Sequence, residues 1–185
     1  MEAEVVLPLV GFLVLVVLFV AFLRRAGRLV AATRDVERFR RQVADLASRV
    51  ETSLGEVSGR VDAVRRNQLD AAGVADDLSA SIDAVDLYAT EARGLHPPVD
   101  GHAIRDGIVG ELERARRALE MVEHGCAIQA SARAGSRELE AQTAIKRGYL
   151  NVLHAREAIT RHAAEAAALV PAVNPRRERP QHYRM

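Results

Sequence analysis

Two groups of histidine and carboxylate side chains carry the metal chemistry that this sequence could support. The first group is His96, Asp100 and His102, which fall within seven residues of one another. Histidine nitrogens and carboxylate oxygens bind zinc, but zinc sites usually add cysteines or paired histidines at a helical spacing. Because neither accompanies this group, we interpret the three side chains as polar residues of a turn.

The second group consists of two Glu/His pairs on predicted helices. Glu120 and His124 are four residues apart, and His154 and Glu157 are three apart. Di-iron bundles use a Glu-x-x-His motif on each of two helices and one Glu from each of two others. The first pair has the wrong spacing and the second has the reverse order, so we interpret both as solvated helix surface. A metal-dependent helical-bundle enzyme is kept as the last alternative.

Cys126 is the single cysteine of the chain, so it cannot form an internal disulfide. It falls on an apolar stripe, where a lone cysteine usually packs as a small hydrophobic side chain. The sequence also has no glycine-rich phosphate loop, no serine or cysteine nucleophile signature and no CxxC pair. We therefore predict no catalytic, cofactor-binding or metal-binding residues, no cofactor and no enzymatic activity.

The segment on which the rest of the chain depends is Val5–Leu23, nineteen residues without a charged, amide or hydroxyl side chain. As a helix it would be about 28 Å long, close to the ~30 Å hydrocarbon core of a bilayer. Sixteen of its residues are Val, Leu or Phe. Their summed preference for insertion is roughly 5 to 10 kcal/mol. We predict a transmembrane helix over residues 5–23, with residues 1–4 as a short external N-terminus.

Positive charge is distributed unequally on the two sides of this segment. No Lys or Arg precedes it, whereas seven arginines follow within residues 24–41. Because positive flanks stay in the cytoplasm, we predict a single-pass protein of the cell membrane, with its N-terminus outside and a cytoplasmic helical domain. A cleavable signal peptide would need a basic start and a small-residue cleavage site, and neither is present before Arg24. The arginines expected to contact the membrane surface are Arg24, Arg25, Arg28, Arg176, Arg177 and Arg179.

The next segment has the apolar pattern of a coiled coil. From Val36 to Ala92, apolar residues recur at spacings of three and four. A narrow seam sustained over about eight heptads is typical of coiled coils. We therefore predict that residues 24–93 form a basic junction and one continuous outgoing helix. Gly94 and the two prolines that follow predict a turn at 94–102, in which Asp100 would cap the next helix.

Residues 103–170 are predicted to form a return helix, with a possible break near 131–137, where Gly135 and two serines weaken the pattern. Residues 171–185 are predicted to be a basic flexible tail. The outgoing and return helices would be roughly 90 and 100 Å long, so they match as an antiparallel coiled-coil hairpin. If the return helix folds back near Gly135, the alternative is a coiled-coil stalk with a three-helix bundle.

Charge and composition limit the partners of this all-α domain. Residues 67–102 carry seven acidic side chains against Arg93, although the whole chain has a net charge of +1. An acidic middle with few aromatic residues disfavours nucleic-acid binding. We expect membrane lipid as a partner, a homo-oligomer formed through the coiled coil, and an unknown protein at the acidic tip around residues 94–102.

These features predict a membrane-anchored cytoplasmic coiled-coil scaffold without catalytic activity. The alternative from another class is a signalling or accessory subunit that relays changes in a partner membrane protein. A stoichiometric receptor or transporter in the purified complex would favour the relay, whereas self-assembly or a cell-envelope complex would favour the scaffold.

Overall fold

The computed structural model describes the backbone of residues 2–131 and 137–170, and their side chains except those of residues 2–14, 21, 23 and 25–32. Every regular element in these ranges is a helix, so the predicted all-α class is confirmed. The contacts divide the chain into two units, one of residues 1–37 with 170–185 and one of residues 38–169. The elements are α1 (Glu2–Arg65), η1 (Ala71–Val74), α2 (Ala75–Gly94), η2 (Val99–Gly101), α3 (His102–Ala130) and α4 (Glu138–Ala168).

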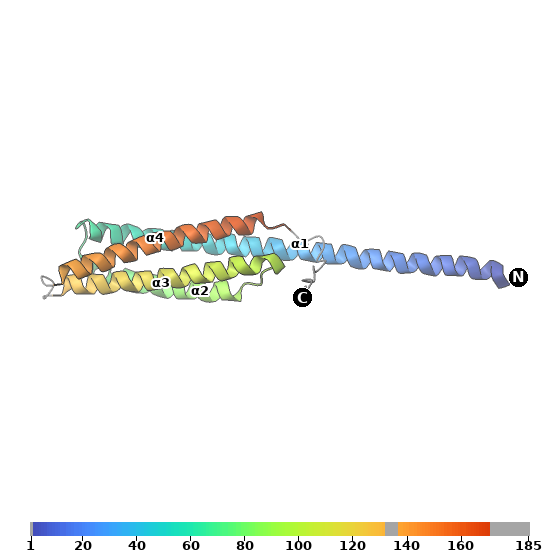
Figure 1. The fold of residues 1–185 in the computed structure, drawn as a ribbon, viewed down its shortest axis with the longest axis horizontal. Helices are drawn as coiled ribbons and strands as arrows, with labels where there is room; N and C mark the ends of the chain where they lie inside the picture. Colours follow the sequence, from blue (N-terminus) through green and yellow to red (C-terminus); the bar gives the residue numbers. More distant parts are fainter. Residues whose placement is uncertain (1, 132–136, 171–185) are drawn as a thin grey trace, which may run out of the picture. The chain divides into compact units, whose positions relative to one another are not determined.

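Residues 38–169 form a helical bundle, in which the second half of α1 lies beside α2, α3 and α4 (Figure 1). In the ion pairs that join α1 to α2 and α2 to α3, the residue number rises along one helix as it falls along the next. The same holds between α3 and α4, where Gly125 lies against Ile145 and Val122 lies against Gly148. The helices are therefore antiparallel neighbours in an up-down-up-down arrangement. The pairs are Arg49–Glu91 and Arg60–Asp77 between α1 and α2, Arg93–Glu113 and Asp86–Arg116 between α2 and α3, and Glu51–Arg156 between α1 and α4.

The predicted continuous helix over residues 24–93 is wrong, because α1 ends at Arg65 and α2 begins at Ala75. Asn67 takes a left-handed backbone conformation with a φ of 58°. The Gln68 amide donates to the carbonyl of Ala63, and the Asn67 amide donates to that of Val64. This pattern is a Schellman motif with Asn in the place of the usual glycine, and it ends the helix.

The antiparallel coiled-coil hairpin is therefore wrong, and so is its alternative, a stalk with a three-helix bundle. The return segment 103–170 is also divided, since α3 ends at Ala130 and α4 begins at Glu138. This division falls where the sequence predicted a possible break, near 131–137, although residues 132–136 lie outside the described residues. Within the described residues, four α-helices thus pack together where the sequence predicted two long ones.

The apolar seam of α1 is buried in the core of this single chain. Each buried Val, Leu or Phe side chain contributes roughly 1.5–3 kcal/mol, so the seam is a main source of the bundle's stability. The expected homo-oligomer is not tested by contacts within one chain and stays a prediction. The seam residues with almost no exposure are Phe39, Val43, Leu46, Val50, Leu54, Val57, Val61 and Val64.

Two glycines let α3 and α4 approach each other closely. A Cβ atom on Gly148 would lie 2.5 Å from Cγ2 of Val122 and 2.6 Å from the backbone carbonyl of Ala118. A Cβ atom on Gly125 would lie 2.8 Å from the side chain of Ile145. No side chain fits at these distances, so the absence of Cβ at both positions sets the separation of the two helices.

The connection between α2 and α3 lies at the end of the bundle where α1 enters it, here called the proximal end. A Cβ atom on Gly101 would be 3.1 Å from the ring of Phe39, and the Arg40 guanidinium donates to the carbonyl of Leu169. The predicted turn at 94–102 is thus not a tip remote from the start of the bundle. The expected cap is also wrong, because Gly101 is the N-cap of α3 and no side chain caps it.

In the first unit, the helical backbone of α1 is continuous from Glu2. Within the side chains that the structure describes, no helix is both long enough and apolar enough to cross a membrane. The predicted span over residues 5–23 includes 5–14, 21 and 23, whose side chains lie outside the described residues. The transmembrane helix therefore stays a prediction. The predicted tail, residues 171–185, lies wholly outside the described residues.

The close α3–α4 contact predicts opposite effects for two Gly→Ala substitutions. Gly148→Ala should lower the free energy of unfolding by about 1–3 kcal/mol, because the backbone of α3 must move to admit the methyl group. Gly110→Ala is the matched control, since nothing lies within 4 Å of its Cβ position. It should raise the free energy of unfolding by about 0.5–1 kcal/mol through helix propensity. Urea titration followed by circular dichroism measures both, and an equal effect of the two would contradict the close contact.

Two serines of α1 give a second test of the core. The Ser58 hydroxyl is buried without a hydrogen-bond partner among the described residues, whereas the Ser53 hydroxyl lies 2.9 Å from that of Tyr88. Ser58→Ala should raise the free energy of unfolding by about 1 kcal/mol, and Ser53→Ala should lower it by about the same amount. The same urea titration compares them. Stabilisation by Ser53→Ala, or marked destabilisation by Ser58→Ala, would show that the hydroxyl contacts are wrongly assigned.

Candidate functional site

The first histidine group lies at the proximal end and is exposed to solvent. His96 belongs to the connection after α2, Asp100 lies within η2, and His102 is the first residue of α3. Among the described residues, no three His, Cys, Asp or Glu side chains are grouped closely enough to hold a metal ion. The structure therefore gives this cluster no metal-binding geometry.

The two Glu/His pairs lie on different helices, and their carboxylates adjoin arginines. Glu120 forms an ion pair of 2.5 Å with Arg116, which also lies 3.5 Å from Asp86 of α2. Glu157 lines a shallow groove between α1 and α4, beside Arg156. Glu120, His124, His154 and Glu157 form no metal-binding group among the described residues. The di-iron arrangement is thus not assembled here.

Cys126 lies at a groove between the start of α2 and the end of α3, with a volume of about 440 Å³. Alanine side chains form much of its lining, and Glu120, Glu123 and His124 complete it. The thiol itself is buried, and burial raises the pKa of Cys126 to about 11. The protonated thiol is a poor nucleophile, so the groove contains no activated cysteine.

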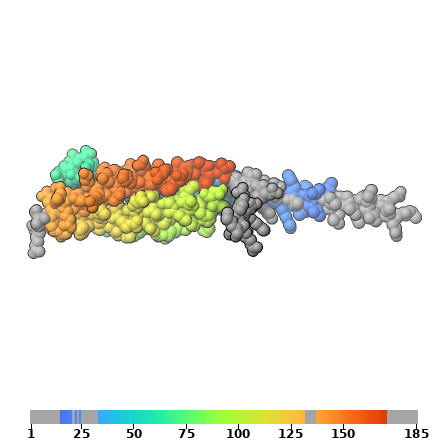
Figure 2. All heavy atoms as spheres, in the orientation of Figure 1, coloured from blue at the N-terminus to red at the C-terminus, as the bar shows by residue number. Residues whose placement is uncertain are grey.

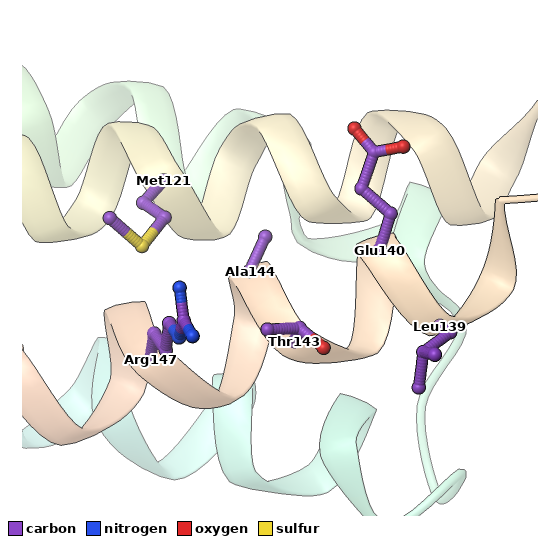
Figure 3. A pocket seen from close by; sticks show the side chains of 6 residues that line it. All are labelled: Met121, Leu139, Glu140, Thr143, Ala144 and Arg147. Carbon is purple, nitrogen blue, oxygen red and sulfur yellow. The ribbon is translucent and has the colours of Figure 1, made fainter.

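A second groove lies between α3 and α4, with a volume of about 470 Å³ (Figure 3). Met121 approaches it from α3, and Figure 3 shows the guanidinium of Arg147 on α4 directed toward Met121. The rest of the lining comes from α4: Leu139, Glu140, Thr143 and Ala144. The lining thus combines exposed apolar side chains with one guanidinium and one carboxylate.

The carboxylate in this groove is held by its own helix. Glu140 accepts two hydrogen bonds of 2.8 Å from Arg137, and this pairing lowers the pKa of Glu140 below its usual value. Arg147, in contrast, is exposed and has no ion pair among the described residues. The net charge that the groove offers to a partner is therefore positive.

Sequence reasoning missed the residues that form this surface. Met121, Leu139 and Leu150 are large apolar side chains that remain exposed on α3 and α4, and Leu87 is their counterpart on α2. All four fall outside the apolar seams that the spacing identified. The sequence signal for this surface is a large apolar residue outside the seam, because such a side chain must face away from the core of its own bundle.

The expected membrane-contact arginines fall in the part of the chain that is least described. Arg24 is exposed, and the side chains of Arg25 and Arg28 lie outside the described residues. Arg176, Arg177 and Arg179 belong to 171–185 and also lie outside them. Their contact with lipid stays a prediction.

Comparisons with protein families, with curated proteins and with solved structures found no match for this chain.

The protonation of Cys126 predicts slow thiol chemistry in the folded protein. Its pKa is raised from a usual value of 9.0 to about 11, so the thiolate fraction at neutral pH is about a hundredfold lower than in an unfolded chain. Reaction with a colorimetric disulfide reagent should be slower by at least that factor in buffer than in denaturant.

The same shift predicts a pH effect on stability. The folded state keeps the proton longer, so this contribution is complete below pH 9 and is lost as the pH rises toward 11. The difference in stability between the wild type and Cys126→Ala should therefore shrink over that interval. A difference that is constant with pH, or rapid labelling of the folded protein, would contradict the burial of the thiol.

Proposed function

We propose that the protein is a non-catalytic scaffold anchored in the cell membrane, with Val5–Leu23 crossing the bilayer and the bundle in the cytoplasm. The observation that carries the proposal is the exposure of residues 15–20, six consecutive Leu, Val and Phe side chains that are between 41% and 65% exposed. Successive residues of an α-helix point about 100° apart, so six of them cover every side. A helix that is apolar on all sides suits hydrocarbon rather than water.

The contrast within α1 supports this assignment. The same helix buries one face from Phe39 to Val64 and exposes charged side chains on the other, as an amphipathic helix of a bundle does. Residues 15–20 have no polar face, and Phe22 is 67% exposed. Apolar surface of this kind is stable when it is shielded from water, and the described residues do not shield it. Lipid can surround a helix on every side.

The arginines after the span supply the orientation. Arg24, Arg25 and Arg28 would lie at the cytoplasmic surface, where each basic residue near anionic lipid contributes about 1 kcal/mol of attraction. Arg176, Arg177 and Arg179 add positive charge in the sequence that follows Leu169, which lies at the proximal end. We propose that both groups contact the inner leaflet.

A scaffold without catalysis is supported by what the charged side chains of the bundle do. Ion pairs hold α1 to α2, α2 to α3 and α1 to α4, so these charges serve the packing of the helices. We do not propose a metal-dependent enzyme, because its expected ligands form no metal-binding group among the described residues.

A relay of changes from a partner membrane protein is the second candidate, and the continuity of α1 favours it. The helical backbone is continuous from Glu2 to Arg65, so the proposed anchor and core residues such as Phe39 belong to one element. The two candidates differ in what copurifies with the protein. A stoichiometric receptor or transporter supports the relay, whereas the chain alone or in multiples supports the scaffold.

Placing charge in the exposed apolar segment tests the anchor. Each arginine near the middle of a span costs about 2.5–3.5 kcal/mol, so Leu15→Arg with Leu18→Arg should cancel most of the insertion preference. The double variant should move from the membrane fraction to the alkaline-carbonate extract. The matched control is Leu87→Arg with Leu139→Arg, which changes two exposed leucines of the bundle and should stay in the membrane fraction.

A reporter that is active only in the cytoplasm, fused after Met185, tests the orientation. It should be active in the wild type, and a reporter that requires export should not. Extraction of the wild type by alkaline carbonate would refute the anchor, and activity of the exported reporter would refute the orientation.

A further inference from the structure

We propose that the bundle carries two complementary surfaces on different sides, by which copies of this chain bind one another side by side in a row. The first is the outer side of α2, here called the acidic face and defined by Asp76, Asp83 and Leu87. The second is the outer α3–α4 groove with its extension to Leu150, here called the basic groove and defined by Met121, Arg147 and Leu150. The inference rests on the proposed function, because the anchor gives all copies the same orientation.

The acidic face consists of side chains of α2 that are not engaged in contacts within the bundle. Asp77, Asp86 and Glu91 are engaged by Arg60, Arg116 and Arg49. Asp76 and Asp83 are exposed and have no ion pair in the part of the chain that the structure describes. Leu87 is one turn beyond Asp83 on the same side of the helix and is 64% exposed. The face therefore offers negative charge beside one large apolar side chain.

The basic groove has the opposite charge and matching apolar residues. Figure 2 shows α3 and α4 side by side along one face of the bundle. Arg147 is exposed without an ion pair among the described residues, and Leu150 follows it by one turn on α4. Met121 lies across the groove from Arg147 (Figure 3). Glu140 is already neutralised by Arg137, so it does not oppose an approaching carboxylate.

The two surfaces lie at similar heights along the bundle. Arg93 of α2 pairs with Glu113 of α3, and Gly148 of α4 packs on Val122 of α3. Counting along α3 from these contacts places Asp83 level with about residue 147 of α4, and Leu87 level with about residue 151. Asp83 of one copy can thus face Arg147 of a neighbour, while Leu87 meets Leu150.

This match in height is what points to a second copy rather than to another partner. Copies that enter one bilayer with the same topology have their bundles the same number of residues from the span, and α2 of one copy can then run parallel to α4 of the next. The surfaces also lie on different sides, because α1 and α3 separate α2 from α4 within the bundle. Contact between unlike surfaces leaves one of each free, so the row can continue.

Disulfide trapping in membranes that contain the full-length protein tests the register. Two differently tagged chains, one with Leu87→Cys and one with Leu150→Cys, should form a mixed dimer on mild oxidation. Neither variant alone should dimerise, and a chain with both substitutions should give a ladder of multimers. The wild type controls for Cys126. The matched control is Leu139→Cys paired with Leu87→Cys, since Leu139 is 79% exposed but about 16 Å farther along α4.

Charge exchange tests the pairing itself. Asp83→Arg and Arg147→Asp should each reduce the ladder at least tenfold, and both changes in one chain should restore it. These residues are exposed and make no ion pair among the described residues, so the fold should be retained, which circular dichroism checks.

Three results would overturn the inference: crosslinking of Leu87→Cys to itself, crosslinking to Leu139→Cys or to a different protein, or no crosslinking of a protein that fractionates with the membrane. In the last case the anchor would still stand. A wild type that alkaline carbonate extracts would instead remove the proposed function, on which the common orientation depends.

Discussion

The reversal of the chain after Arg65 is the constraint on which the rest of the bundle depends. Asn67 takes the left-handed conformation and closes α1, and Asp70 then accepts a hydrogen bond from Ala72 at the start of η1. Without this reversal, the seam of α1 would need a partner helix from another chain. With it, α2 returns along α1, and the seam from Phe39 to Val64 is buried within one molecule. The buried seam thus stabilises the single chain.

Close packing of α3 and α4 is the second consequence of this arrangement. Gly125 and Gly148 allow the two backbones to approach, so this pair of helices is held by contacts that tolerate no added methyl group. The other described pairs are linked by ion pairs between half-buried or exposed arginines and exposed carboxylates. Such surface pairs contribute about 0–1 kcal/mol each. These ion pairs mainly favour one arrangement of neighbouring helices. The apolar core supplies most of the stability.

Most apolar and charged side chains of the bundle make contacts within it, so few are available to bind a partner. Once the seams are buried and most charges of α2 are paired, the remaining features are few: Asp76, Asp83 and Leu87 on one side, and Arg147 with its apolar neighbours on another. An interface formed from such remainders would be modest in area, and a common orientation in the membrane would lower the entropic cost of forming it.

By itself the sequence determined the helical class and the apolar positions of the core, and it predicted a membrane span over residues 5–23, because these follow from composition and periodicity. It did not determine the number of helices. The apolar spacing continues in phase across residues 66–70, so nothing in the period marks the left-handed turn at Asn67. Only the tertiary structure decided that Gly101 lies against Phe39 and that Asp83 and Arg147 lie at one height. Both depend on which helices become neighbours, and local periodicity carries no information about that choice.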